Sequence, residues 1–211
     1  MALVEFWFTE QPFVSFEKEV REFTLLTTKK LFLLKELGEF VFNLAGDYAE
    51  VGVYRGGSLK FIAKSFPEKN ILGFDTFASM PKTDSSIDIY KEGQFGDTNL
   101  NDVQKLLRNC PNVTLYPGFF PATATILEEP QFSFVHVDVD IYPSVLSCCE
   151  WFYPRLVTGG VIINDDYGHT QCPGAKKAFD EFFQGREKII RTTIGTAFII
   201  KHCAVVPNDK R

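Results

Sequence analysis

Hydrophobic and polar positions follow two spacings along the chain, and the spacing changes several times. In the segment 18–45, leucines recur at helical spacing with lysines and glutamates between them. From residue 47 onwards, short apolar runs alternate with segments of helical spacing. The predicted strands are 48–53, 70–75, 113–116, 132–138 and 160–165. The predicted helices are 18–45, 58–66, 99–108, a segment starting at Pro143, and 173–183.

Strands that alternate with helices predict a parallel sheet with helices on both faces. The apolar runs 132–138 and 160–165 suit strands that are buried on both sides. Residues 188–193 and 196–202 predict a final hairpin around Gly195. Between the second strand and the next helix, residues 76–98 predict a long loop, and loops of this length are often lids.

The ends of the chain differ from this pattern. Residues 1–22 carry many aromatic side chains with no clean period, which predicts either an arm that covers a pocket or a partner subunit, or a terminal helix packed on the core. Residues 206–211 predict a frayed tail. We therefore expect a single domain over 23–205, in agreement with the total length of 211 residues.

Composition narrows the class of protein. Lys and Arg number 22 and Asp and Glu number 27, so the net charge is −5, which gives no global attraction to nucleic acid or to an anionic membrane. No apolar run approaches the roughly 18 residues of a membrane span, and the first residues lack the features of a signal peptide. Five cysteines without a C-x-x-C pair predict free thiols in the reducing cytoplasm.

A glycine-rich turn follows the first predicted strand. Its spacing is G-x-x-x-G-G from Gly52 to Gly57, which differs from the G-x-G-x-x-G of dinucleotide sites, and Glu50 precedes it. An acid there disfavours a pyrophosphate and favours a cationic ligand. Asp75, at the end of the second strand, suits two ribose hydroxyls. The pair favours S-adenosylmethionine (SAM), although a tight structural turn would also explain the glycines.

Acidic residues end two further strands. Asp138 and Asp140 follow one buried strand, and Asp165 and Asp166 follow the next. Neighbouring strand ends open onto one crevice, where such carboxylates require protons or a cation. Oxygen ligands indicate Mg²⁺, with Mn²⁺ or Ca²⁺ as alternatives. The alternative interpretation is that these acids are solvated loop residues or helix caps.

A cation at this place has a chemical use, because it would stabilise the alkoxide of a substrate hydroxyl. The candidates to take the hydroxyl proton are Asp138, Asp140 and His169. A carboxylate bound to metal is a weaker base, which favours Asp140 or His169. His136 lies inside an apolar strand, so we interpret it as a hydrogen-bonded core residue.

Together these segments resemble the macrocin O-methyltransferase family, whose members depend on SAM and Mg²⁺. The matching segments are 49–58, 73–77, 118–121, 136–142, 153–156, 159–162, 165–169 and 174–178. The resemblance implies an α/β, Rossmann-like class I methyltransferase fold, with a mostly parallel seven-stranded sheet and an antiparallel edge strand. It also implies that Asp138 or Asp140 is the base. The implied metal ligands are Asp138, Asp165 and Asp166, and the implied SAM-binding residues are Glu50, Gly52, Tyr54, Ser58, Asp75, Gly118 and Phe119.

The chain departs from the family pattern in two places. Family members often carry a longer N-terminal region, so the acceptor site here is expected to be more open or to be completed by another subunit. The segment Thr170–Pro173 also differs from the usual aromatic-containing version, and it faces the acceptor. The aromatic N-terminal segment and the habit of the family point to a homodimer.

We therefore predict a metal-dependent O-methyltransferase that acts on a hydroxyl of a small molecule. Family members methylate sugars of antibiotics and related natural products, so a glycosylated natural product is the expected acceptor, and a catechol would chelate equally well. The alternatives are a nicotinamide-dependent oxidoreductase, which leaves the clustered carboxylates without a purpose, and a non-catalytic SAM-binding protein.

Overall fold

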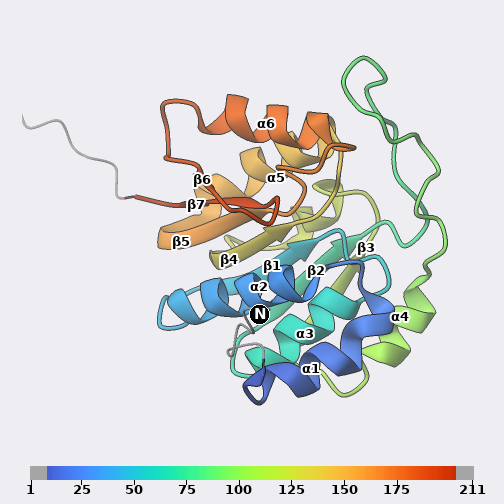
Figure 1. The fold of residues 1–211 in the computed structure, drawn as a ribbon, viewed down its shortest axis with the longest axis vertical. Coiled ribbons are helices and arrows are strands. Elements are labelled where there is room, and N and C mark those ends of the chain that lie inside the picture. The colour runs from blue at the N-terminus through green and yellow to red at the C-terminus, as the bar shows by residue number, and fades with distance from the viewer. Residues whose placement is uncertain (1–8, 203–211) are drawn as a thin grey trace, which may run out of the picture.

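One mixed sheet organises the computed structural model, which describes residues 9–202. The sheet has seven strands in the order β3-β2-β1-β4-β5-β7-β6 (Figure 1). The strands are β1 Asp47–Val51, β2 Ile71–Asp75, β3 Val113–Pro117, β4 Phe132–Val137, β5 Leu156–Asn164, β6 Ile190–Arg191 and β7 Ala197–Ile200. Strands β1 to β5 pair in parallel, and β7 pairs antiparallel with both β5 and β6. The predicted fold class is confirmed. The antiparallel strand is β7, which lies second from the edge of the sheet that β6 forms.

Helices cover both faces of the sheet. The α-helices are α1 Phe13–Val20, α2 Thr28–Phe40, α3 Gly57–Ser65, α4 Leu100–Leu106, α5 Tyr142–Arg155 and α6 Pro173–Phe183, and the 3₁₀ helices are η2 Arg21–Phe23 and η3 Ala122–Ile126. Helices α5 and α6 lie on one side of the sheet, and α1, α2 and α3 lie on the other (Figure 1). Each side has its own cluster of buried apolar side chains. No helix in residues 9–202 combines the length and the apolar character that crossing a membrane requires.

The central strands are apolar because both of their faces are covered. All six residues of β4 are buried, and so are the last five residues of β5. Such a strand has no solvent-facing side on which polar residues could alternate. The predicted hairpin after residue 188 is β6 and β7, and residues 76–98 contain no helix or strand, as expected.

Several predicted boundaries differ from the structure; the last parallel strand, for example, begins at Leu156 rather than at residue 160. The segment 18–45 is not one helix, because the backbone is extended at Thr24. A new helix begins after Thr27, whose hydroxyl caps it by accepting a hydrogen bond from the Lys30 amide (3.3 Å). The first strand ends at Val51 rather than at residue 53, because Gly52 takes a φ of +95° and turns the chain.

Part of the predicted N-terminal arm can be described. Residues 13–20 form α1, which packs against α3, and Phe13 is 2% exposed with its ring edge against Phe61. Of the two alternatives for this segment, the described residues adopt the packed helix. Residues 1–8 and the predicted tail 206–211 lie outside the described residues.

A close helix contact joins α2 to the sheet. Tyr48 on β1 is fully buried, and its hydroxyl donates a hydrogen bond to the Gly38 carbonyl of α2 (2.6 Å). A Cβ at Gly38 would lie 2.4 Å from the ring of Phe66, which follows α3, so glycine is what allows α2 to pack against this ring. This contact fixes the helix that also carries a residue of the site described below.

Replacing Tyr48 by Phe should lower the free energy of unfolding by about 1–2 kcal/mol, because the buried Gly38 carbonyl loses its donor. Urea unfolding would measure this change. The matched control is Tyr142→Phe, because the Tyr142 hydroxyl donates to Glu181 at the surface. The free energy of unfolding of that variant should change by no more than about 0.5 kcal/mol. Equal changes in the two variants would contradict the prediction.

Candidate active site

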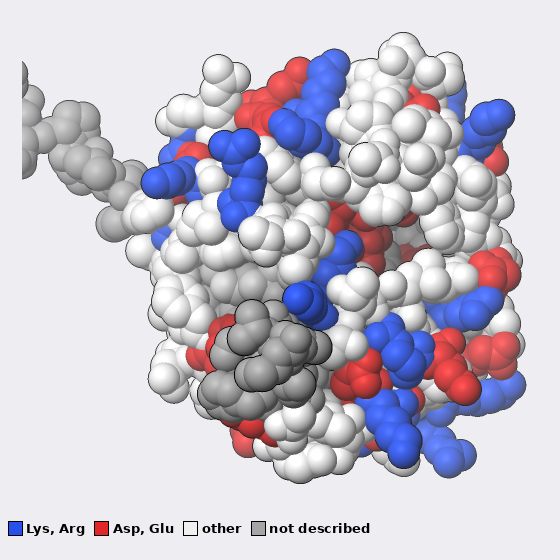
Figure 2. Space-filling view, in the orientation of Figure 1, with Lys and Arg blue, Asp and Glu red and all other residues white. Residues whose placement is uncertain are grey.

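A cavity of about 280 Å³ opens where β1, β2, β4 and β5 end. On this face of the molecule Figure 2 shows a hollow with acidic side chains at its bottom and basic side chains at its edge. Eleven of the twelve predicted site residues line the cavity: Gly52, Tyr54, Ser58, Asp75, Gly118, Phe119, Asp138, Asp140, Asp165, Asp166 and His169. The parallel sheet thus brings together residues that are far apart in the sequence.

Glu50 is the exception, because it does not line the cavity. Its side chain is fully buried, and Oε1 lies 2.8 Å from His136 Nδ1 on the neighbouring strand. Burial alone would lower the pKa of His136, but Asp165 and Glu50 raise it to about 10. Glu50 therefore faces the His136 imidazole within the protein, whereas the sequence pattern predicts that it faces a ligand. His136 is a hydrogen-bonded core residue, as interpreted.

Gly52 has a steric role at the end of β1. A Cβ at this position would lie 1.8 Å from the Asp138 carbonyl oxygen, and its φ of +95° is also unfavourable for other residues. The Gly52 amide donates to the Phe74 carbonyl (2.9 Å), and the Asp138 amide donates to the Val51 carbonyl (2.9 Å). The glycine turn and the first acidic strand end are therefore in direct backbone contact.

Asp75 organises the turn from the adjacent strand. Its Oδ2 accepts the Tyr54 amide (2.8 Å) and its Oδ1 accepts the Phe77 amide (2.7 Å). Burial raises the pKa of Asp75, and these backbone donors oppose the shift. Oδ1 also accepts a longer hydrogen bond from the Thr76 hydroxyl (3.4 Å), whereas Oδ2 keeps a further lone pair for a ligand hydroxyl.

Three carboxylates converge at the other side of the cavity. Oxygens of Asp138, Asp165 and Asp166 all lie within 4.8 Å of one another. Burial and the neighbouring carboxylates raise the pKa values of Asp138 and Asp166 well above their usual range. Burial would also raise the pKa of Asp165, but His136 and Lys30 lower it. Asp165 Oδ1 is buried and has no hydrogen-bond partner in the described residues, so an acceptor atom remains open to a cation.

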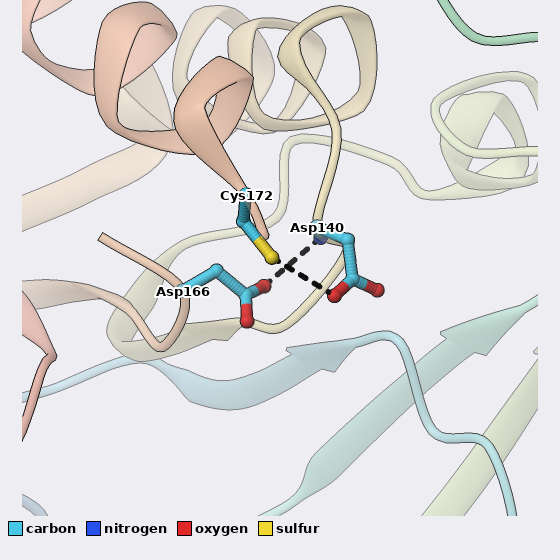
Figure 3. A group of neighbouring side chains, drawn as sticks. All are labelled: Asp140, Asp166 and Cys172. Atoms are coloured by element: carbon cyan, nitrogen blue, oxygen red, sulfur yellow. Dashed lines mark hydrogen bonds between the residues drawn. The ribbon is translucent and has the colours of Figure 1, made fainter. Parts of the chain in front are cut away.

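Asp166 also belongs to a second cluster of polar side chains, together with Asp140 and Cys172. Cys172 Sγ donates to Asp140 Oδ1 (3.4 Å), and the Asp140 amide donates to Asp166 Oδ2 (2.9 Å) (Figure 3). Cys172 Sγ also lies 3.5 Å from His169 Nδ1. Burial raises the pKa of Cys172, and the nearby carboxylates add to that effect, so it is a thiol rather than a thiolate. The segment that departs from the family pattern thus contacts two of the candidate bases.

Several residues at the cavity had no clear signal in the sequence. Lys30 lines it from α2, and its ammonium bonds the Asp165 side chain and the Asp165 carbonyl (3.1 Å). In the sequence it is one of several lysines on the polar face of a helix, a position that usually indicates solvent. Tyr90 and Phe95 line the cavity from the long loop 76–98.

The long loop is fixed by a charge at a helix end. Asp88 is 8% exposed, and its Oδ1 accepts the backbone amide of Tyr142 in the first turn of α5 (2.9 Å). Gly174 of α6 lies against the same oxygen, and a Cβ there would be 1.9 Å from it. This anchor places the loop beside the acidic group.

Replacing Gly52 by Ala should lower the free energy of unfolding by roughly 3 kcal/mol or more, because the ends of β1 and β4 would have to separate. Chemical denaturation gives the value. The matched control is Gly93→Ala, since Gly93 has a similar φ of +89° but no atom of the described residues lies within 4 Å of its Cβ position. That variant should lose only about 1 kcal/mol through backbone strain. Similar losses in both variants would show that the close contact is unimportant.

The fold and the cavity define the class of protein, a Rossmann-like class I SAM-dependent methyltransferase. The structure superposes on that of the O-methyltransferase NovP with a TM-score of 0.74, at 23% identity, covering 86% of this chain and 83% of that chain. Residues 20–196 match the profile of the macrocin-O-methyltransferase (TylF) family. The chain belongs to this family, and it is a SAM-dependent O-methyltransferase.

Two characterised relatives are similar in sequence. Demethyldecarbamoylnovobiocin O-methyltransferase of Streptomyces niveus is 27% identical over 183 residues, which are 75% of this chain and 67% of the relative. Mycinamicin III 3''-O-methyltransferase of Micromonospora griseorubida is 27% identical over 201 residues, which are 82% of this chain and 78% of the relative.

Proposed function

We propose that this protein is a Mg²⁺-dependent enzyme that transfers a methyl group from SAM to a hydroxyl of a small molecule, a sugar of a glycosylated natural product. The observation that carries the proposal is the convergence of three carboxylates beside the glycine turn in one cavity. Both relatives are named for natural products that they methylate, demethyldecarbamoylnovobiocin and mycinamicin III. A nicotinamide-dependent oxidoreductase would have no use for this acidic group.

The metal ligands in this proposal are Asp138, Asp165 and Asp166. Their oxygens are close enough to share one ion, and their all-oxygen donor set suits Mg²⁺. In the described part of the chain, no hydrogen bond competes for Asp165 Oδ1. Mn²⁺ or Ca²⁺ would fit the same donors. A divalent ion held there would stabilise the acceptor alkoxide and orient two neighbouring oxygens of the acceptor.

The methyl donor would lie across the ends of β1, β2 and β3. Asp75 would accept hydrogen bonds from both ribose hydroxyls, and the proposed SAM-binding residues on the cavity wall are Gly52, Tyr54, Ser58, Asp75, Gly118 and Phe119. Glu50 would act from below the cavity, by holding His136 and through it Asp165, rather than by direct contact with SAM.

Asp140 is the proposed general base. It lines the cavity beside Asp166 but lies outside the group of three metal ligands, so its carboxylate would not be bound by the metal and can take the acceptor proton. His169 is the alternative, and it lies on the other side of Cys172. As the proton leaves, the acceptor oxygen forms a bond to the methyl carbon and the sulfonium–methyl bond breaks, which releases S-adenosylhomocysteine. The reaction is a displacement in line, so positioning dominates the barrier.

Two further predictions from the sequence remain predictions. The four cysteines in the described part of the chain are free and buried, which supports a reducing compartment such as the cytoplasm. A homodimer is supported by the exposed side chains of Phe23 and Leu25, which also line the cavity.

Calorimetric titration with S-adenosylhomocysteine tests the methyl-donor site. We expect a dissociation constant in the micromolar range, and no binding of NADH under the same conditions. Binding of NADH without binding of S-adenosylhomocysteine would contradict the proposal and favour the oxidoreductase. If the donor site is present, polyhydroxylated acceptors can be screened by the S-adenosylhomocysteine that they generate.

Replacing Asp138 by Asn should weaken Mn²⁺ binding at least about tenfold, because one of three anionic ligands becomes neutral. The affinity for S-adenosylhomocysteine should change less than about threefold. Electron paramagnetic resonance of free Mn²⁺ measures the first quantity and calorimetry the second. Asp102→Asn, which removes an exposed acid on α4, is the control and should change neither. Unchanged Mn²⁺ affinity in Asp138→Asn would remove this residue from the ligand set.

A further inference from the structure

Lys30 is the one cationic side chain of α2 that enters the described cavity. Its ammonium donates to Asp165 Oδ2 and to the Asp165 carbonyl oxygen (3.1 Å), and the side chain is 15% exposed. These two bonds join a helix that covers one face of the sheet to the acid at the end of β5.

The charge of Lys30 is maintained by its surroundings. Its ammonium forms an ion pair with the Asp165 side chain, and oxygens of Asp138 and Asp166 lie within 4.8 Å of an Asp165 oxygen. The same three carboxylates are the proposed metal ligands. A positive charge therefore lies directly beside the proposed ligands of the divalent ion.

The two oxygens of Asp165 have different partners. Oδ2 is bonded to Lys30, whereas Oδ1 has no hydrogen-bond partner within residues 9–202 and lies 3.6 Å from His136 Nε2. A metal ion can therefore use Oδ1 while Lys30 stays on Oδ2. In that arrangement the ammonium and the ion share one carboxylate and repel each other at short range.

We propose that Lys30 is a positioning residue that serves as a built-in cation of the metal site: it holds the carboxylates together before the metal binds and weakens the affinity of the site for the metal. The inference rests on the proposed metal site. It assigns to α2 a role in the chemistry at the sheet, in addition to its role in packing.

Electrostatics decides whether removing Lys30 strengthens or weakens metal binding. Removing Lys30 loses one hydrogen-bonded contact that orients Asp165, which on its own would weaken metal binding. It also removes the repulsion between a unit charge and a double charge at short range, which is the larger of the two effects in a partly buried site. The metal should consequently bind more tightly without Lys30, and the metal-free protein should be less stable.

The experiment compares Mn²⁺ binding to the full-length wild-type protein and to Lys30→Met, which keeps the apolar stem. Electron paramagnetic resonance should show a dissociation constant lower by about tenfold in the variant. In EDTA its melting temperature should fall by about 5 °C, and Mn²⁺ should raise it by more than in the wild type.

Two controls separate charge from folding. Lys30→Arg keeps the charge and should bind Mn²⁺ within about threefold of the wild type. Lys29→Met removes a neighbouring exposed lysine that does not line the cavity, and it should leave the Mn²⁺ affinity unchanged.

Equal or weaker Mn²⁺ binding in Lys30→Met, with a wild-type protein that binds Mn²⁺, would overturn this inference alone. Absence of Mn²⁺ binding in every variant, with S-adenosylhomocysteine still bound, would overturn the metal part of the proposed function and this inference with it.

Discussion

The arrangement of buried negative charge at the carboxyl edge of the sheet is the constraint on which the site depends. Five acidic side chains lie at the ends of β1, β4 and β5, Glu50, Asp138, Asp140, Asp165 and Asp166, and two cationic side chains oppose them, His136 and Lys30. Such a group is costly to bury unless opposite charges and hydrogen bonds compensate it. The ion pairs run from Glu50 through His136 to Asp165 and then to Lys30, so they connect the core of the sheet to a covering helix.

The compensation is incomplete, and this incompleteness gives the site its chemistry. The cationic side chains lower the pKa of Asp165, whereas burial and the neighbouring carboxylates raise the pKa values of Asp138 and Asp166. A protein that needed only stability would be expected to place apolar residues at these positions. Retained, mutually repelling carboxylates beside a cavity indicate a site that is completed by a cation.

The same edge of the sheet joins the donor side of the cavity to the acidic side. Gly52 lies against the Asp138 backbone, so the turn that ends β1 and the acid that ends β4 cannot move independently. Opposite them, the loop 76–98 is anchored on α5 by Asp88, and it contributes aromatic side chains to the cavity. Relatives of this family that accept different molecules would be expected to differ in such peripheral segments rather than in the strand ends.

The sequence by itself determined the class of fold and most of the cavity wall. Apolar runs that end in acids define parallel strands whose ends meet, because the alternation with helices leaves few other topologies. Tertiary structure decided the partners of individual charges. Glu50 faces His136 because β1 and β4 pair in the register that places these two residues opposite each other. Lys30 bonds to Asp165 because the packing of α2 on the sheet brings the two residues together. A side chain's partner depends on distances between segments remote in the chain, and neither residue type nor local spacing contains that information.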